Sequence, residues 1–235
     1  MSIPVRAGVF GLLAVQSCSP APRNDAAAGH PDIVLEATDS AATEFYRTVA
    51  DEYESEREAI RRAGHRVSRT PGTLRITTRN GGLRSLVDTI VDGGRHLRFV
   101  YDHFAPHLDA HVIREQYYEG HAYLLVNDSS GRDTLLASVP ILSPDNRRFA
   151  VASLDLDAFY HPNILQVWRP AGDSVLREFE IDAGEAWGPD SVSWISEDTI
   201  RFVRTRRNRG ELTDLYSSHI LVRRADTWAI DPVIP

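Results

Sequence analysis

The chain has 235 residues, with 33 acidic and 26 basic side chains and a formal net charge of −7. This acidic balance gives no electrostatic reason to expect nucleic-acid binding. Every basic residue is Arg, which excludes chemistry that needs a lysine, such as Schiff-base catalysis, Ser–Lys dyads and the phosphate-loop lysine. The single cysteine, Cys18, leaves no partner for an intrachain disulfide and no thiolate metal site.

The first residues have the pattern of an export signal. Arg6 precedes an apolar run at residues 7–15, which is far shorter than the ~20 residues of a membrane-spanning helix. Residues 15–18, Val-Gln-Ser-Cys, resemble the lipobox of bacterial lipoproteins, although Gln16 stands where those usually have a small residue. The resemblance implies a signal peptide over 1–18, lipidation of Cys18 and a periplasmic, envelope location. Two alternatives stay open: a cleaved signal without lipid, and a start codon assigned too late.

Two further segments precede the body of the chain. Residues 19–38 are rich in Pro, Ala and Asp and are expected to form a flexible tether. Apolar side chains such as Phe45, Val49 and Ile60 then recur at helical spacing. Gly64 is expected to end the helix, so this spacing predicts an amphipathic helix over 39–64.

Residues 72–235 are expected to form one β domain. Short alternating runs are separated by turn residues, of which Asn80-Gly81-Gly82 is the plainest example. Many short strands with frequent turns indicate a sandwich, barrel or propeller.

A repeat in the sequence narrows the choice of fold. Pro144-Asp145 and Pro189-Asp190 stand 45 residues apart, within the length of a propeller blade, and Phe104-Ala-Pro106 is a weaker third start. The stretch Ser-Pro-Asp-Asn-Arg-Arg-Phe-Ala at 143–150 resembles the turn of WD40-like and TolB-like propeller blades, with Asn146 in place of the usual Gly. Residues 72–235 are too few for four blades of about 43 residues each. We therefore expect an all-β fold: a small or incomplete β-propeller-like stack of antiparallel sheets with one N-terminal helix.

Two groups of residues are candidate metal ligands. His103, His107 and His111 are four residues apart and would share one face of a helix, although Pro106 opposes a helix there. Asp155, Asp157 and Asn163 could offer oxygen ligands to calcium, but they are more simply explained as a loop between strands.

A cluster of arginines is the candidate for binding an anionic partner. Arg204, Arg206, Arg207 and Arg209 follow Arg201 closely, and guanidinium groups suit phosphate and carboxylate ligands. The alternative is a solvated hairpin tip. The four tryptophans, which are expected to pack in the core, are Trp168, Trp187, Trp194 and Trp228.

No motif of known catalytic chemistry occurs in the sequence. We expect a non-catalytic binding or scaffold module, without a cofactor, that contacts a protein partner at the cell envelope and the membrane through its lipid anchor. One alternative is a metal-assisted envelope hydrolase using His103, His107 and His111. Another is a structural lipoprotein that pairs through an open sheet edge. A binding module predicts a shallow surface with exposed aromatic side chains, whereas a hydrolase predicts His and acidic groups in one deep pocket.

Overall fold

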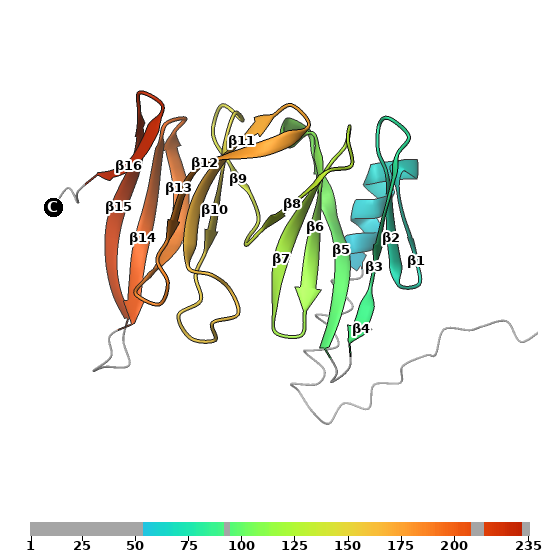
Figure 1. Ribbon diagram of the computed structural model, residues 1–235, viewed down its shortest axis with the longest axis horizontal. Coiled ribbons are helices and arrows are strands. Elements are labelled where there is room, and N and C mark those ends of the chain that lie inside the picture. The colour runs from blue at the N-terminus through green and yellow to red at the C-terminus, as the bar shows by residue number, and fades with distance from the viewer. Residues whose placement is uncertain (1–53, 92–94, 208–213, 232–235) are drawn as a thin grey trace, which may run out of the picture. The chain divides into compact units, whose positions relative to one another are not determined.

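The computed structural model describes residues 54–91, 95–207 and 214–231, all within one compact unit (Figure 1). The expected signal peptide, Cys18, the tether and Arg209 lie outside the described residues. Helical residues in the described part run from 54 to 63, and the rest of the expected helix lies outside it. A 3₁₀ turn, η1 (Gly64–Arg66), follows, with Gly64 in the left-handed region at φ 66°. None of the described helices is long and apolar enough to cross a membrane.

The described strands form four antiparallel sheets, so the expected all-β, propeller-like class is confirmed. The first sheet has the order β1 (Val67–Thr70), β2 (Thr73–Thr77), β3 (Leu83–Val87). The second has the order β4 (Thr89–Val91), β5 (Arg95–Ala105), β6 (Ala110–Tyr117), β7 (Gly120–Asn127), β8 (Asp133–Leu136), with η2 (Pro106–Leu108) between β5 and β6.

The other two sheets each have four strands. The third has the order β12 (Ser174–Asp182), β11 (Ile164–Ala171), β10 (Phe149–Ser153), β9 (Ile141–Leu142). The fourth has the order β13 (Gly188–Ser196), β14 (Thr199–Arg207), β15 (Asp214–Arg224), β16 (Thr227–Asp231).

Three core clusters join successive sheets into a stack. The first, which includes Leu74 and Ile113, packs the helix and first sheet on the second. The next, with Val112 and Phe149, joins the second sheet to the third, and the last, with Leu165 and Phe202, joins the third to the fourth. Each of these six residues is fully buried, so burial of apolar side chains holds the stack together. Among the described residues, no core cluster joins the fourth sheet to the first, and the stack is open.

A buried carboxylate fixes the helix to the second sheet. Glu56 is 2% exposed, and its Oε1 accepts hydrogen bonds from the Tyr101 backbone N–H at 3.0 Å and from Arg69 Nη2 at 2.8 Å. Its Oε2 accepts a bond from Arg98 Nη2 at 3.2 Å. Because these partners come from β1 and β5, one side chain ties three elements together.

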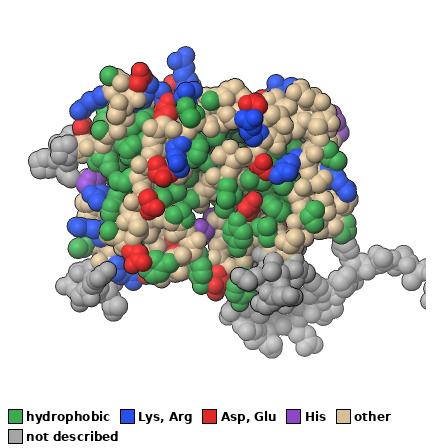
Figure 2. Space-filling model, in the orientation of Figure 1, with side chains coloured by type: hydrophobic (Ala, Val, Ile, Leu, Met, Phe, Trp, Pro, Cys, Tyr) green, Lys and Arg blue, Asp and Glu red, His purple; other side chains and the backbone are tan. Residues whose placement is uncertain are grey.

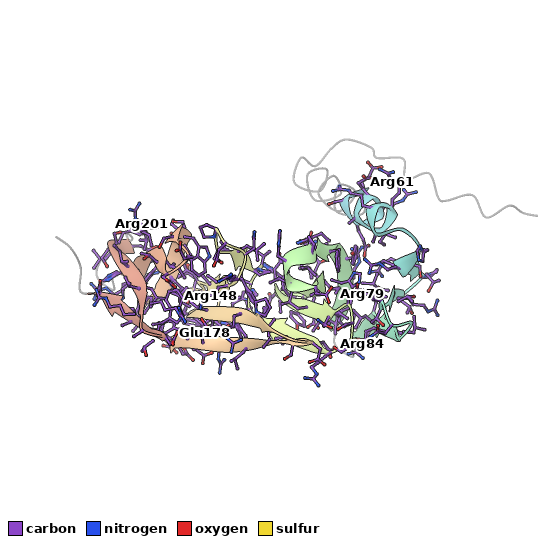
Figure 3. All side chains as sticks on the ribbon, turned by 90° about the horizontal axis from the view of Figure 1, so that it is seen from above. Arg61, Arg79, Arg84, Arg148, Glu178 and Arg201 are labelled. Atoms are coloured by element: carbon purple, nitrogen blue, oxygen red, sulfur yellow. The ribbon has the colours of Figure 1, made fainter. Side chains whose placement is uncertain are left out.

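A second polar contact joins the third and fourth sheets. Arg148 and Glu178 lie side by side in Figure 3, with 2.7 Å between Arg148 Nε and Glu178 Oε2. Trp228 of β16 donates its indole N–H to the same oxygen at 3.1 Å. Burial would raise the pKa of Glu178, but the hydrogen bonds of Arg148 and Trp228 lower it below its usual value.

The suspected repeat does not mark equivalent positions. Pro144-Asp145 lies in the turn between β9 and β10, where Asn146 has a φ of 58°. Pro189 lies inside β13, and Pro106 begins η2. The two Pro-Asp pairs therefore occupy different parts of their sheets.

Candidate functional site

An open groove lies at one end of the second and third sheets. Its volume is about 780 Å³, and it lies between the β6–β7 turn, the end of β8 and the loop that joins β10 to β11. That turn and that loop are both at the lower edge of Figure 1. The lining is mainly apolar and aromatic, with Tyr117, Tyr118 and Tyr160 as its largest side chains. We call this surface the tyrosine groove.

The β6–β7 hairpin presents two of these tyrosines. Tyr117 pairs with Gly120 across the hairpin, so that Tyr118 and Glu119 form its two-residue tip. Gly120 has a φ of 140°, and a Cβ there would lie 2.9 Å from His161 Nε2. Glycine is therefore needed both for the backbone conformation and for the close approach of the opposite loop. The tip leaves Tyr118 66% exposed.

The β10–β11 loop is held by the carboxylate of Asp155. This group accepts backbone N–H bonds from Ala158 at 2.8 Å, Tyr160 at 2.7 Å and His161 at 3.1 Å. Burial would raise the pKa of Asp155, but these backbone donors lower it to about 2. The loop is therefore ordered by its own backbone, and it presents Tyr160 with 57% of its surface exposed.

Buried Asn163 fastens the other end of this loop. Its Oδ1 accepts the Asp155 N–H at 2.6 Å, and its Nδ2 donates to the carbonyl oxygens of Asp155 and Gly184. The expected calcium ligands Asp155 and Asn163 thus serve as loop-forming groups. Asp157, the third, forms an ion pair with Arg207.

Two histidines connect the hairpin with the loop. His161 Nε2 accepts a long hydrogen bond, 3.4 Å, from the His121 backbone N–H, and the two ring centroids are 5.2 Å apart. Burial lowers the pKa of His121, and His161 and Arg114 lower it further. The lowered pKa favours the neutral form of the His121 imidazole in the groove.

Two tyrosine hydroxyls of the groove donate to carboxylates. Tyr117 Oη donates to Glu115 Oε2 at 2.6 Å, and the pKa of Tyr117 is raised to about 12 by burial and by this bond. The pKa of Tyr160 is raised chiefly by its hydrogen bond to Glu119. Both phenols are therefore held as neutral donors, with negative charge at the rim of the groove.

The structure does not bring His103, His107 and His111 together. Pro106 begins a 3₁₀ turn instead of a helix, so His103 is on β5, His107 in η2 and His111 on β6. The His103 side chain is half exposed, whereas His111 is fully buried. No group of three metal-binding side chains gathers anywhere in the part of the chain that the structure describes.

His111 belongs instead to a buried polar chain that the sequence did not indicate. Its Nδ1 lies 3.1 Å from Tyr101 Oη and its Nε2 lies 3.2 Å from Asp128 Oδ1. Arg66 Nη1 donates to Asp128 Oδ2 at 2.5 Å. Burial lowers the pKa of His111 against the opposing effect of Asp128. This chain links η1 to the second sheet, and no groove residue takes part in it.

The arginine cluster is divided among different contacts. Arg204 lies over the ring of Trp187, with its guanidinium carbon 4.2 Å from the centroid. Arg207 pairs with Asp157 and Asp214, while Arg201 and Arg206 are exposed. Figure 2 likewise shows basic and acidic side chains interspersed on the visible face. Trp187 and Trp228 are buried, and Trp168 and Trp194 pack against core clusters.

The groove tyrosines were missed by the sequence analysis. Part of their signal was present, since Phe159-Tyr160 stands in the polar stretch that was expected to be a loop between strands, and Tyr117-Tyr118 stands just before Gly120. Large aromatic residues in turns have no core to fill, so they are candidates for binding.

Comparisons with known proteins add little to this description. No protein-family model and no curated protein matches the chain. The crystal structure of the N-terminal domain of Nup159, a β-propeller, is similar with 12% sequence identity and a TM-score of 0.33. The match covers 70% of this chain and 46% of that chain, so this protein spans about half the length of the structure that it resembles. Such a low TM-score gives no support to a shared function, and the fold rests on the four sheets themselves.

Proposed function

We propose that the protein is an exported, lipid-anchored protein of the bacterial cell envelope, and that it acts as a non-catalytic binding or scaffold module on the periplasmic side. The export signal and the lipobox-like residues before Cys18 support the location. The tyrosine groove supports the binding role and is the proposed contact surface for a protein partner.

The groove carries this proposal because it combines exposed aromatic area with an ordered framework. Tyr118 projects from a two-residue hairpin tip and Tyr160 from a loop whose backbone Asp155 holds, so less backbone entropy remains to be lost on binding. Tyrosine is enriched at binding hot spots because it offers a large apolar surface and a polar tip. An open surface of this kind suits a macromolecular contact better than the enclosure of a reacting substrate.

A comparison of crosslinked complexes from the native envelope tests the proposal. The protein and a double variant, Tyr118→Ala with Tyr160→Ala, are expressed in cells, crosslinked, purified from the membrane fraction and analysed by mass spectrometry. Tyr216→Ala is the matched control, since Tyr216 is 65% exposed on β15 and does not line the groove. We expect a reproducible partner with the wild-type and control proteins, and its loss from the double variant.

Equal recovery of the partner with all three proteins would refute the groove as the contact surface. Recovery of no partner from the wild-type protein would count against the binding role itself.

A further inference from the structure

The charge of the tyrosine groove selects against anions. Among the described residues that line it, Glu119 is the one carboxylate, and no arginine is present. Glu115, which binds Tyr117, adds a second negative charge beside the lining. The lowered pKa of His121 favours its neutral form, and Arg114, whose charge acts on His121, is not among the lining residues. An occupant that is neutral along most of its length and basic at one point matches this charge.

Two side chains of the lining that could accept an N–H bond from a ligand already have donors. The Gln166 amide oxygen accepts the indole N–H of Trp168 at 3.0 Å, and its nitrogen donates to Glu180 at 2.6 Å. His161 Nε2 already accepts the His121 N–H. A buried N–H without a partner is costly, so the groove favours a backbone with few such groups. Proline provides this property, since it has no N–H.

The exposed rings offer flat surfaces on two sides of the groove. Tyr117 and Tyr118 come from the β6–β7 hairpin, and Tyr160 and Pro162 come from the opposite loop. A polyproline II segment is already extended before it binds, and grooves lined by aromatic side chains commonly take such segments. Leu135 and Ala137 complete an apolar surface at the end of β8.

We infer that the tyrosine groove binds a proline-rich segment of its protein partner, with an Arg or Lys beside the prolines pairing with Glu119. This inference rests on the proposed binding function of the same groove and specifies the chemistry of the partner. The proline rings pack against the tyrosine faces, and the basic side chain meets the carboxylate at the hairpin tip.

Fluorescence anisotropy with labelled peptides and the detergent-purified full chain tests this inference. The probe is a terminally blocked nonapeptide, Arg-Pro-Ala-Pro-Pro-Ala-Pro-Ala-Pro. One control peptide has alanine in place of every proline, and another has glutamate in place of the arginine. We expect the alanine peptide to bind at least about 10-fold more weakly, because it is disordered and adds N–H groups. The glutamate peptide should bind more weakly than the probe as well.

Protein variants locate the contact. Tyr118→Ala should weaken the binding of the probe about fivefold, the effect of losing one aromatic packing contact, while the control Tyr216→Ala leaves the affinity unchanged. Glu119→Gln should weaken the arginine probe and not a probe with glutamine at that position. Circular dichroism confirms that each variant is folded.

Equal binding of the proline and alanine peptides, or equal binding by wild type and Tyr118→Ala, would overturn the inference. If the peptides fail while partner capture still depends on Tyr118 and Tyr160, this inference falls and the proposed function stands. If the peptides fail to bind and partner capture does not depend on Tyr118 and Tyr160, the groove is excluded as a binding site.

Discussion

Replacing Glu56 by Gln should destabilise the protein by about 3 kcal/mol. Removing one member of a buried ion pair typically costs about 3–5 kcal/mol, because the remaining charge is left buried without compensation. Glu56 is 2% exposed and accepts bonds from Arg69, Arg98 and the Tyr101 N–H. Arg69 retains a second carboxylate, Asp88 at 3.0 Å, which places the cost at the lower end of that range.

Thermal unfolding followed by circular dichroism measures this effect. For a domain of this size, a loss of about 3 kcal/mol lowers the Tm by about 6–12 °C. Glu58→Gln is the matched control on the same helix, since the Glu58 carboxylate meets Arg61 and Arg62 in solvent. Its effect on Tm should be slight because exposed ion pairs are screened by water. A Tm shift no larger for Glu56→Gln than for Glu58→Gln would refute the argument that this buried carboxylate fixes the helix.

Three further predictions concern pH, the groove and the anchor. Burial keeps the folded-state pKa of His111 below its ordinary 6.5, so the unfolded chain binds the proton first and stability falls as the pH drops below about 6.5. His111→Gln should reduce this slope in urea titrations between about pH 7 and 5, and an unchanged slope would contradict it. Gly120→Ala should lower the Tm and raise amide hydrogen exchange in the β10–β11 loop, because the added Cβ meets His161; unchanged exchange would exclude that contact. Cys18→Ser should move the protein from the membrane to the soluble fraction, and continued membrane partitioning would exclude a lipid anchor.

Local patterns predicted much of the fold. Short alternating runs were expected from residue 72 onward, as β2 shows, and the Asn80–Gly82 turn lies between β2 and β3 as expected. Asn146 adopts the left-handed conformation that its place in the turn required. β1 was missed because it lies before residue 72, between the expected helix and the expected β domain, and is defined by its pairing with β2.

The candidate site was not predictable in the same way. The groove joins Gly120 to His161, which are 41 positions apart and meet through the packing of two sheets. Single-sequence periodicity carries no information about such a contact. The three histidines at four-residue intervals were expected on one face of a helix, but they do not meet. Pro106 places them on two strands and a turn, and of the three only His111 is buried. The spacing of residues predicted strands and turns because these elements depend on interactions between near neighbours in the chain.

The most direct test of the binding role is photocrosslinking in intact cells. A photoreactive amino acid replaces Tyr118 in one strain and Tyr216 in another, both being exposed tyrosines of the described chain. The binding account predicts a discrete crosslinked product, containing one partner protein, from position 118 and none from position 216. Identical products from the two positions, or no product from position 118, would contradict the claim that the tyrosine groove is the contact surface.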